Sequence, residues 1–315
     1  MDVLSDLLHR GRAGDALVRQ LIQRAPWSMT YEDVPPLTVV TAIGGPAAVR
    51  VLGAGRPAAV LDPGDIALLT AGGPYTVASA PDAPARFVIR GGRKFVAGSG
   101  EVAPERVPLA PRTYGDDAPG ATTMLRGAFH VTGAVGDRLL GMLPALAVVP
   151  AGPRTRPVLE LLAAETARDG PGQDAVLARL LDLVLVMALR AWCAGPEADP
   201  PGWYTALADP AVGAALQRMH AEPARRWTVA ELAAAGRLSR AAFAARFVRQ
   251  VGEPPLAYLT GWRMALAADR LRAGDDTVAV VAREAGYADA FAFSVAFKRA
   301  HGVSPSAWRK SGRAA

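Results

Sequence analysis

One stretch of this chain contains an internal sequence repeat, and this duplication constrains the fold more than any other feature. Between Trp227 and Arg309, a shift of fifty positions brings several residues onto the same or a similar residue type. Each copy reads as a short apolar helix, a glycine-containing turn and a second helix with phenylalanines at i and i+4. The matched pairs are Gly236 with Gly286, Phe243 with Phe293, Phe247 with Phe297, Arg249 with Arg299, Gly252 with Gly302, Pro255 with Pro305, and Tyr258 with Trp308.

A capping residue stands before the second helix of each copy. Ser239 precedes it in the first copy and Asp289 in the second, and both residue types favour helix N-termini. A helix, a turn of a few residues and a second helix form the helix-turn-helix motif. The sequence therefore predicts two such motifs, at about 228–250 and 277–300.

A continuous helix is predicted between the two motifs. Residues 255–273 carry apolar side chains at helical spacing, with Gly261 as the only internal glycine. A helix of this length spans about 28 Å, and successive major-groove faces of a duplex lie about 34 Å apart. The spacer could therefore set both motifs on one face of double-stranded DNA.

The positive charge of the chain is concentrated on the duplicated region. From Leu207 onward there are sixteen Lys or Arg against nine Asp or Glu, whereas the preceding residues carry nineteen against twenty. Because phosphate contacts supply most sequence-independent affinity for nucleic acid, this region is where a duplex would bind. On charge alone, a merely solvated basic face is a fair alternative, and the duplicated motif makes it the weaker one.

Several spaced motifs near the end of the chain carry a family resemblance. They read GY at 286–287, FSVAFKR at 293–299 and GVSPSAWR at 302–309. Together with the spacer, they resemble the DNA-binding domain of AraC/XylS-type regulators over roughly 210–310. The resemblance implies an all-α domain that binds asymmetric promoter sites through both motifs.

The resemblance also assigns candidate DNA contacts on the faces opposite the paired phenylalanines. The slots that face bases hold Ala241, Ala244, Ala245, Ala290, Phe291 and Val295, with Ser294 also pointing outward. Relatives frequently carry Arg, Gln or Trp there, whereas apolar residues can only touch a thymine methyl. We therefore expect sequence choice to come from thymine contacts, DNA shape and half-site spacing. The residues expected to grip phosphates are Arg240, Arg246, Arg263, Lys298 and Arg299.

The region from about 36 to 131 has the pattern of an antiparallel β-structure. Short runs rich in Val, Ile and Thr alternate with turns that contain glycine and proline. Residues 98–120 are rich in proline, glycine and charge, and are predicted to form a loop. The DPGD turn at 62–65 and the GGP turn at 72–74 are similar to the cupin-type sensor domain of such regulators. This resemblance implies a β-barrel or sandwich that senses a small molecule.

The residues that a metal-binding cupin needs are not where the resemblance would place them. Tyr75 stands where a histidine is expected, and His130 is the only histidine of the β region. Arg126 occupies a position at which related sensor domains can carry a cysteine, and the single cysteine, Cys193, lies in an apolar helix. We therefore expect no metal, no cofactor, no redox switch and no catalytic residues.

Helices are predicted on either side of the β region. Residues 2–23 read as a helix broken near the glycines at 11 and 14, and 136–143, 157–168 and 174–194 read as further helices. The last is apolar almost all round, which predicts burial in the core, in a dimer interface or in both. Residues 195–202 read as a linker.

These patterns predict an α+β protein of two domains: a cupin-like β-barrel or sandwich with flanking helices at 1–200, and an all-α double helix-turn-helix domain at 207–310. The predicted function is a DNA-binding transcription regulator, not an enzyme, whose first domain senses a small molecule, dimerises or does both. Activation through RNA polymerase is favoured, although repression by occlusion fits the residues equally well. The alternative is a small-molecule-binding or enzymatic β-barrel protein with an accessory nucleic-acid domain.

The composition of the chain indicates in which cellular compartment it works. An apolar content of 51% argues against wholesale disorder, and one cysteine fits a reducing compartment. No apolar run is long enough to cross a membrane, and the first residues lack a signal peptide's order of basic then apolar residues. We therefore expect a cytoplasmic, nucleoid-associated bacterial protein without membrane contact.

Overall fold

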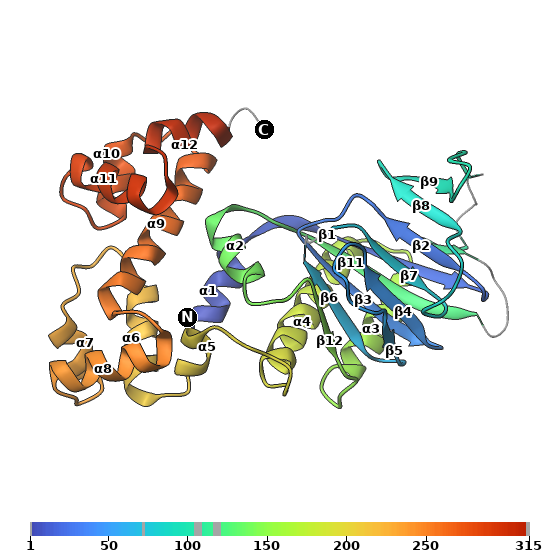
Figure 1. The fold of residues 1–315 in the computed structure, drawn as a ribbon, viewed down its shortest axis with the longest axis horizontal. Helices are drawn as coiled ribbons and strands as arrows, with labels where there is room; N and C mark the ends of the chain where they lie inside the picture. Colours follow the sequence, from blue (N-terminus) through green and yellow to red (C-terminus); the bar gives the residue numbers. More distant parts are fainter. Residues whose placement is uncertain (1, 71–72, 104–108, 116–120, 313–315) are drawn as a thin grey trace. The chain divides into compact units, whose positions relative to one another are not determined.

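The computed structural model describes residues 2–70, 73–103, 109–115 and 121–312, without the side chains of 12–16 and 312 (Figure 1). The chain divides into two compact units, one rich in β-structure and one helical. The β-rich unit consists of Ala13–Val131 and Leu143–Asp199. The helical unit consists of Met1–Arg12, Thr132–Met142 and Pro200–Ala315, so it draws on three separate stretches of sequence.

The β-rich unit contains two six-stranded sheets, with strand orders β10-β1-β11-β3-β6-β12 and β5-β4-β7-β2-β8-β9. Their inner faces enclose a core that includes Trp27, Tyr31, Val40, Tyr75 and Met124. The strands are β1 Arg12–Gln23, β2 Ser28–Tyr31, β3 Leu37–Gly44, β4 Ala47–Val51, β5 Ala59–Leu61, β6 Ile66–Thr70, β7 Tyr75–Ala78, β8 Phe87–Arg90, β9 Arg93–Val96, β10 Thr113–Gly115, β11 Thr122–Val131 and β12 Leu146–Val149. The predicted β-structure is confirmed.

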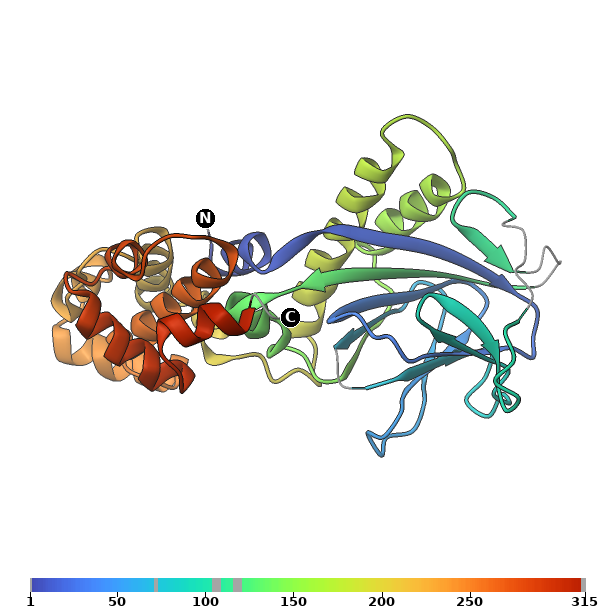
Figure 2. The same ribbon diagram turned by 90° about the horizontal axis from the view of Figure 1, so that it is seen from above.

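The structure corrects the predicted limits of this region. The helix predicted for residues 2–23 ends at Arg10, and the following residues form β1, which lies beside β11 (Figure 2). β1 also pairs in parallel with β10, inside the predicted loop. The apolar pairs in residues 17–22 have helical spacing, but backbone hydrogen bonds to the neighbouring strands decide the structure of this segment. Of that loop, residues 104–108 and 116–120 lie outside the described residues.

Two helices cover the β-rich unit, α3 Arg156–Thr166 and α4 Gln173–Cys193. α4 packs closely on β11: a Cβ atom on Gly127 would lie 2.4 Å from Leu181 Cδ1. One face of α4 is buried, as its apolar sequence predicts, and Cys193 lies in that face. The other face leaves Val176 and Leu183 each 45% exposed. The predicted role of this helix in dimerisation stays a prediction.

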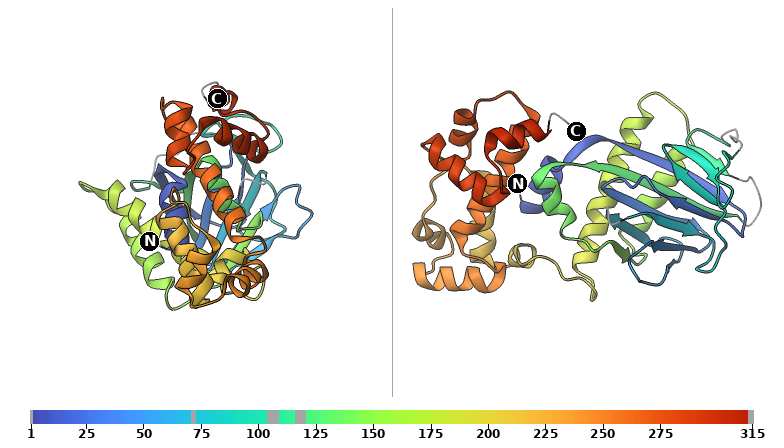
Figure 3. Two further views of the ribbon diagram at one scale, coloured as in Figure 1. Left: turned by 90° about the vertical axis from the view of Figure 1, so that its left-hand side faces the viewer. Right: turned by 45° about the horizontal axis from the view of Figure 1, so that its top comes forward.

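The helical unit places α9 between two pairs of helices, α7 with α8 and α10 with α11 (Figure 3). Its helices are α1 Val3–Arg10, α2 Gly133–Leu140, α5 Gly202–Ala206, α6 Pro210–Ala221, α7 Val229–Ala235, α8 Arg240–Val251, α9 Pro255–Ala273, α10 Val278–Glu284, α11 Ala290–His301 and α12 Pro305–Gly312. Both predicted helix-turn-helix motifs and the predicted spacer helix are present.

Two helices from the first half of the sequence complete the core of the helical unit. Val3 and Leu7 of α1 and Val135 of α2 are buried in the same apolar cluster as Leu216 and Trp262. A second cluster, around Phe293 and Phe297, holds α10 and α11 on α9. The sequence did not predict that α1 and α2 would pack with the helix-turn-helix motifs.

Buried polar contacts fix α1 in this unit. Asp6 is 1% exposed, and its carboxylate lies 3.1 Å from His220 Nδ1, while His220 Nε2 lies 2.8 Å from the Tyr258 hydroxyl. Because a carboxylate only accepts, Nδ1 carries a proton. Burial lowers the pKa of His220, and the neutral ring then accepts at Nε2 from the Tyr258 hydroxyl. Burial raises the pKa of Asp6, but hydrogen bonds from His220 and Arg10 outweigh this and leave the pKa below its usual value.

Asp269 on α9 fixes α2 in a similar way. Its carboxylate accepts from the backbone N–H of Ala134, at 2.5 Å, and of Val135, at 3.0 Å. These are donors of the first turn of α2, which have no partner within the helix itself. Burial raises the pKa of Asp269, and the two hydrogen bonds oppose that rise.

The turns of the two helix-turn-helix motifs differ by one residue. In the first, the residue with positive φ that ends the helix is Arg237, at 54°, and in the second it is Gly286, at 80°. The N–H group of the next residue closes each turn, from Leu238 to Ala233 O and from Tyr287 to Ala282 O. Gly286 therefore corresponds to Arg237 and not, as the fifty-residue shift suggested, to Gly236. The first helices match at an offset of 49, and the second helices at an offset of fifty.

Arg237→Gly is expected to stabilise the protein. A non-glycine residue in the left-handed region costs about 1 kcal/mol, part of which is offset by the greater freedom of glycine in the unfolded chain. The measurement is the urea midpoint of the variant against the unmodified chain. Arg237→Asn, which tolerates the same φ, should give a smaller gain, and Arg237→Val a loss. Equal midpoints for all three variants would contradict this account.

Candidate nucleic-acid interface

Each helix-turn-helix motif presents its second helix, α8 or α11, in the same way. Phe243 and Phe247 are fully buried on one side of α8, as are Phe293 and Phe297 on α11. Ser239 caps α8 by accepting from Ala242 N–H at 3.2 Å. The burial of the paired phenylalanines leaves the opposite side of each helix facing outward.

The positions predicted to face bases lie on these outward sides. Phe291 is 75% exposed and Val295 is 56% exposed, so two large apolar side chains one helical turn apart face outward on α11. Ser294 is half-buried and donates its hydroxyl to Ala290 O at 2.7 Å, so it is partly occupied within α11. The remaining predicted positions are Ala241 and Ala245, which are exposed, and Ala244 and Ala290, which are half-buried.

Three of the predicted phosphate contacts are exposed cations beside these faces. They are Arg240 at the start of α8 and Lys298 and Arg299 in the last turns of α11. Within the described residues, no carboxylate pairs with any of the three. An exposed, unpaired cation can meet a phosphate without first breaking an ion pair.

Arg246 is differently placed, because it is bound to Asp209 at the start of α6. Its Nε lies 2.7 Å and its Nη2 2.5 Å from Asp209 Oδ2, and Gln250 Nε2 lies 2.8 Å from the same oxygen. Asp209 also accepts from the N–H groups of Ala211 and Val212. Burial raises the pKa of Asp209, but these hydrogen bonds outweigh it and bring the pKa to about 2.

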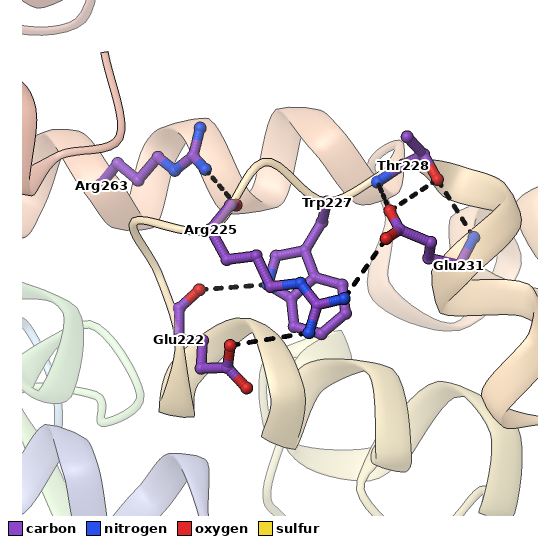
Figure 4. A network of polar contacts seen from close by, with 6 residues as sticks. All are labelled: Glu222, Arg225, Trp227, Thr228, Glu231 and Arg263. Atoms are coloured by element: carbon purple, nitrogen blue, oxygen red, sulfur yellow. Dashed lines mark hydrogen bonds and ion pairs between the residues drawn. The ribbon is translucent and has the colours of Figure 1, made fainter. Parts of the chain in front are cut away.

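Arg263 is also occupied, on α9 rather than on a recognition helix (Figure 4). Its Nε donates to Pro223 O and its Nη2 to Arg225 O, both at 2.6 Å. Burial lowers the pKa of the Arg263 guanidinium. These two hydrogen bonds to backbone carbonyl oxygens show that Arg263 holds the loop between α6 and α7.

That loop contains a network that the sequence did not reveal. The Arg225 guanidinium lies 3.9 Å from the centre of the Trp227 ring and pairs with Glu222 and Glu231 (Figure 4). Glu231 also closes a capping box with Thr228 at the start of α7. The only signal in the sequence is the threonine three residues before a glutamate. The network positions the first motif through the loop between α6 and α7. Sequence patterns within single helices do not indicate such contacts.

The described residues contain no cluster of three or more His, Cys, Asp or Glu that could hold a metal ion. Among the described helices, none is long and apolar enough to cross a membrane.

Comparisons with known proteins match both the β-rich and the helical parts of the chain. A family model described as Cupin matches residues 2–194, and one described as Helix-turn-helix domain matches residues 232–311. The chain is similar to putative AraC-like transcription regulators of Streptomyces lividans, with 34% identity over 98% of each chain, and of Streptomyces antibioticus, with 33% identity over 98% of this chain and 99% of the relative. Among solved structures, it is similar to the DNA-binding domain of AdpA in complex with a target DNA, with 32% identity, a TM-score of 0.32, and coverage of 34% of this chain and 96% of that domain.

Proposed function

Because the chain belongs to the AraC-like transcription regulators, with a cupin N-terminal domain and a helix-turn-helix domain that binds DNA, we propose that it reads promoter DNA mainly through apolar contacts. The observation that carries this proposal is the exposed, apolar outward face of α11, with Phe291 and Val295. Exposed apolar side chains at base-facing positions can contact thymine methyl groups, and cannot form the paired hydrogen bonds that identify guanine or adenine.

The proposed phosphate contacts are Arg240, Lys298 and Arg299, which flank these faces. Arg246 and Arg263 act in this proposal as positioning residues, because each guanidinium already binds groups of the helical unit. Ala241, Ala244 and Ala245 of α8 and Ala290 and Ser294 of α11 complete the proposed readout surface. The alanines leave room for close approach of the helices to the bases, and carry no donor of their own.

Two sets of variants separate readout from phosphate contact. Phe291→Ala with Val295→Ala is expected to reduce preference for the specific site by about tenfold, since the loss of recognition at one base pair of a specific site costs roughly 1–3 kcal/mol. Lys298→Ala is expected to weaken specific and nonspecific binding alike, and to reduce the slope of log affinity against log salt by about one. The measurement is fluorescence anisotropy with the intergenic DNA beside the gene, with and without excess nonspecific duplex, across a salt series.

Arg218→Ala is the charge-matched control, because Arg218 is exposed on α6 and outside the proposed surface. It should leave the salt slope unchanged. If the Phe291 and Val295 variant keeps full site preference, the apolar readout is wrong. Loss of site preference in the Lys298 variant alone would assign the readout to the cation instead.

We further propose that the cupin domain senses a small molecule, and that the chain acts as a homodimer on the bacterial nucleoid. Of activation and repression, we favour activation through contact with RNA polymerase, because the family resemblance supports it. The exposed side of α4, with Val176 and Leu183, is the proposed dimer surface. The mechanism is allosteric regulation of DNA binding rather than catalysis.

A further inference from the structure

A positively charged side chain points into the sandwich of the β-rich unit. Arg126 lies on β11 opposite Val40 of β3, and it shares an inward face with Met124. It is half-buried, and no carboxylate among the described residues pairs with it. Withdrawing a cation from water without a counter-ion costs free energy, so this position calls for an explanation.

Two stacked tyrosines lie beside the Arg126 guanidinium. The rings of Tyr31 and Tyr75 lie 5.0 Å apart at 19°, and the Arg126 Cζ lies 4.5 Å from the first ring centre and 5.9 Å from the second. Arg126 Nε donates to the Tyr75 hydroxyl at 2.6 Å. Its terminal nitrogens, Nη1 and Nη2, have no hydrogen-bond partner within the described part of the chain. The planar fork of donors that suits an oxyanion is therefore free.

A buried hydroxyl beside this cluster also lacks a partner. Thr38 is fully buried, and its Oγ1 makes no well-formed hydrogen bond within the described part of the chain, although it lies close to Tyr75. Buried hydroxyls without a partner are uncommon, because the lost hydration is not replaced. Thr38 can supply a further hydrogen bond to a ligand at Arg126.

A second cation, on β1, packs against another tyrosine, and its charge also acts on Tyr31. Arg19 of β1 stands 5.4 Å from the centre of the Tyr114 ring and is exposed. Burial raises the pKa of Tyr31, and the charges of Arg126 and Arg19 both oppose that rise. The cluster of Arg126, Tyr31, Tyr75 and Thr38 therefore carries a positive field, and no carboxylate from the described residues pairs with Arg126.

We propose that this cluster, hereafter the arginine–tyrosine cluster, binds the oxyanion group of a small molecule, such as a carboxylate or a phosphate. The terminal N–H groups of Arg126 would hold two oxygens side by side, Thr38 would supply a further hydrogen bond, and the tyrosine rings would shield the ion pair from water. This proposal rests on the proposed sensing role in one respect: it identifies the bound oxyanion as the small molecule that the cupin domain senses.

Ligand-observed NMR titration of the full-length protein tests the site directly. Acetate, butyrate and inorganic phosphate serve as probes, with ionic strength held constant by chloride. Saturable binding is expected, and Arg126→Met should weaken it by at least about tenfold, because hydrogen bonds to charged groups are strong. Arg50→Met is the control, since Arg50 is exposed on β4. It should bind as the unmodified chain does.

The probes distinguish the sources of the oxyanion. Saturation by acetate or butyrate indicates a carboxylate ligand, and saturation by phosphate alone indicates a phosphate. If no probe saturates, or if Arg126→Met binds as well as the unmodified chain, the proposal is overturned. If Arg126→Met fails to fold, Tyr75→Phe decides, because it removes the hydroxyl that orients Arg126; binding unchanged in that variant also overturns the proposal. DNA binding measured without probes stays a separate test, so failure here leaves the regulator intact.

Discussion

Asp6→Ala is expected to lower the free energy of unfolding of the helical unit by about 3 kcal/mol, because it removes one partner of a buried polar pair. The variant leaves His220 Nδ1, which now faces Asp6 at 3.1 Å, without an acceptor in a buried site. It also releases Arg10, which pairs with Asp6 at 2.6 Å. We expect α1 to detach from α6 as a result.

Hydrogen exchange followed by mass spectrometry measures this directly, because the amides of α1 and α6 should lose protection together. Asp2→Ala is the matched control in the same helix. Asp2 is exposed and accepts from Ser5 at the start of α1, so its loss should cost only about 1 kcal/mol. Unchanged protection of α1 in the Asp6 variant would show that apolar packing alone holds this helix.

Asp209→Ala should have the second-largest effect, with a loss of about 2 kcal/mol or more in stability. Asp209 accepts four hydrogen bonds, two from the first turn of α6 and two from side chains of α8. Its removal takes away the cap of α6 and leaves Arg246 without its counter-ion. Because Arg246 lies on α8, the variant should also misplace the first recognition helix.

Asp289→Ala provides the comparison, since Asp289 caps α11 through the N–H groups of Phe291 and Ala292 and is exposed. In the part of the chain that the structure describes, its hydrogen bonds come only from the backbone of its own helix. Urea unfolding should therefore show a clearly smaller loss than for Asp209→Ala. If both variants lose the same stability, the cap alone matters, and the contacts of Asp209 with α8 contribute nothing.

The helical motifs could be predicted because every local signal agreed. The capping residues, the phenylalanines at i and i+4, and the terminating Gly252 and Gly302 all depend on neighbours within one turn. The family resemblance that these motifs supported is confirmed by the relatives that match over 98% of the chain.

Long-range partners explain what could not be predicted. β1 reads locally as a helix, and it becomes a strand because β10 and β11 offer their backbone groups to it. The packing of α1 against α6 depends on His220, more than two hundred residues away. The partners of Arg246 and Arg263 could not be predicted, since nothing local marks Asp209 or Pro223 as groups that bind these side chains. The DNA contacts themselves stay predictions.

The helical unit draws on three distant stretches of sequence, and this has a consequence for how it folds. During synthesis, α1 is made well before its partner His220, which lies 214 residues after Asp6. Contacts of such long sequence separation form slowly, because a large loop must close before they can stabilise anything. Until then, Val3 and Leu7 remain exposed to other chains. Expression at lower temperature or with a chaperone should therefore favour soluble protein more than strengthening any local helix does.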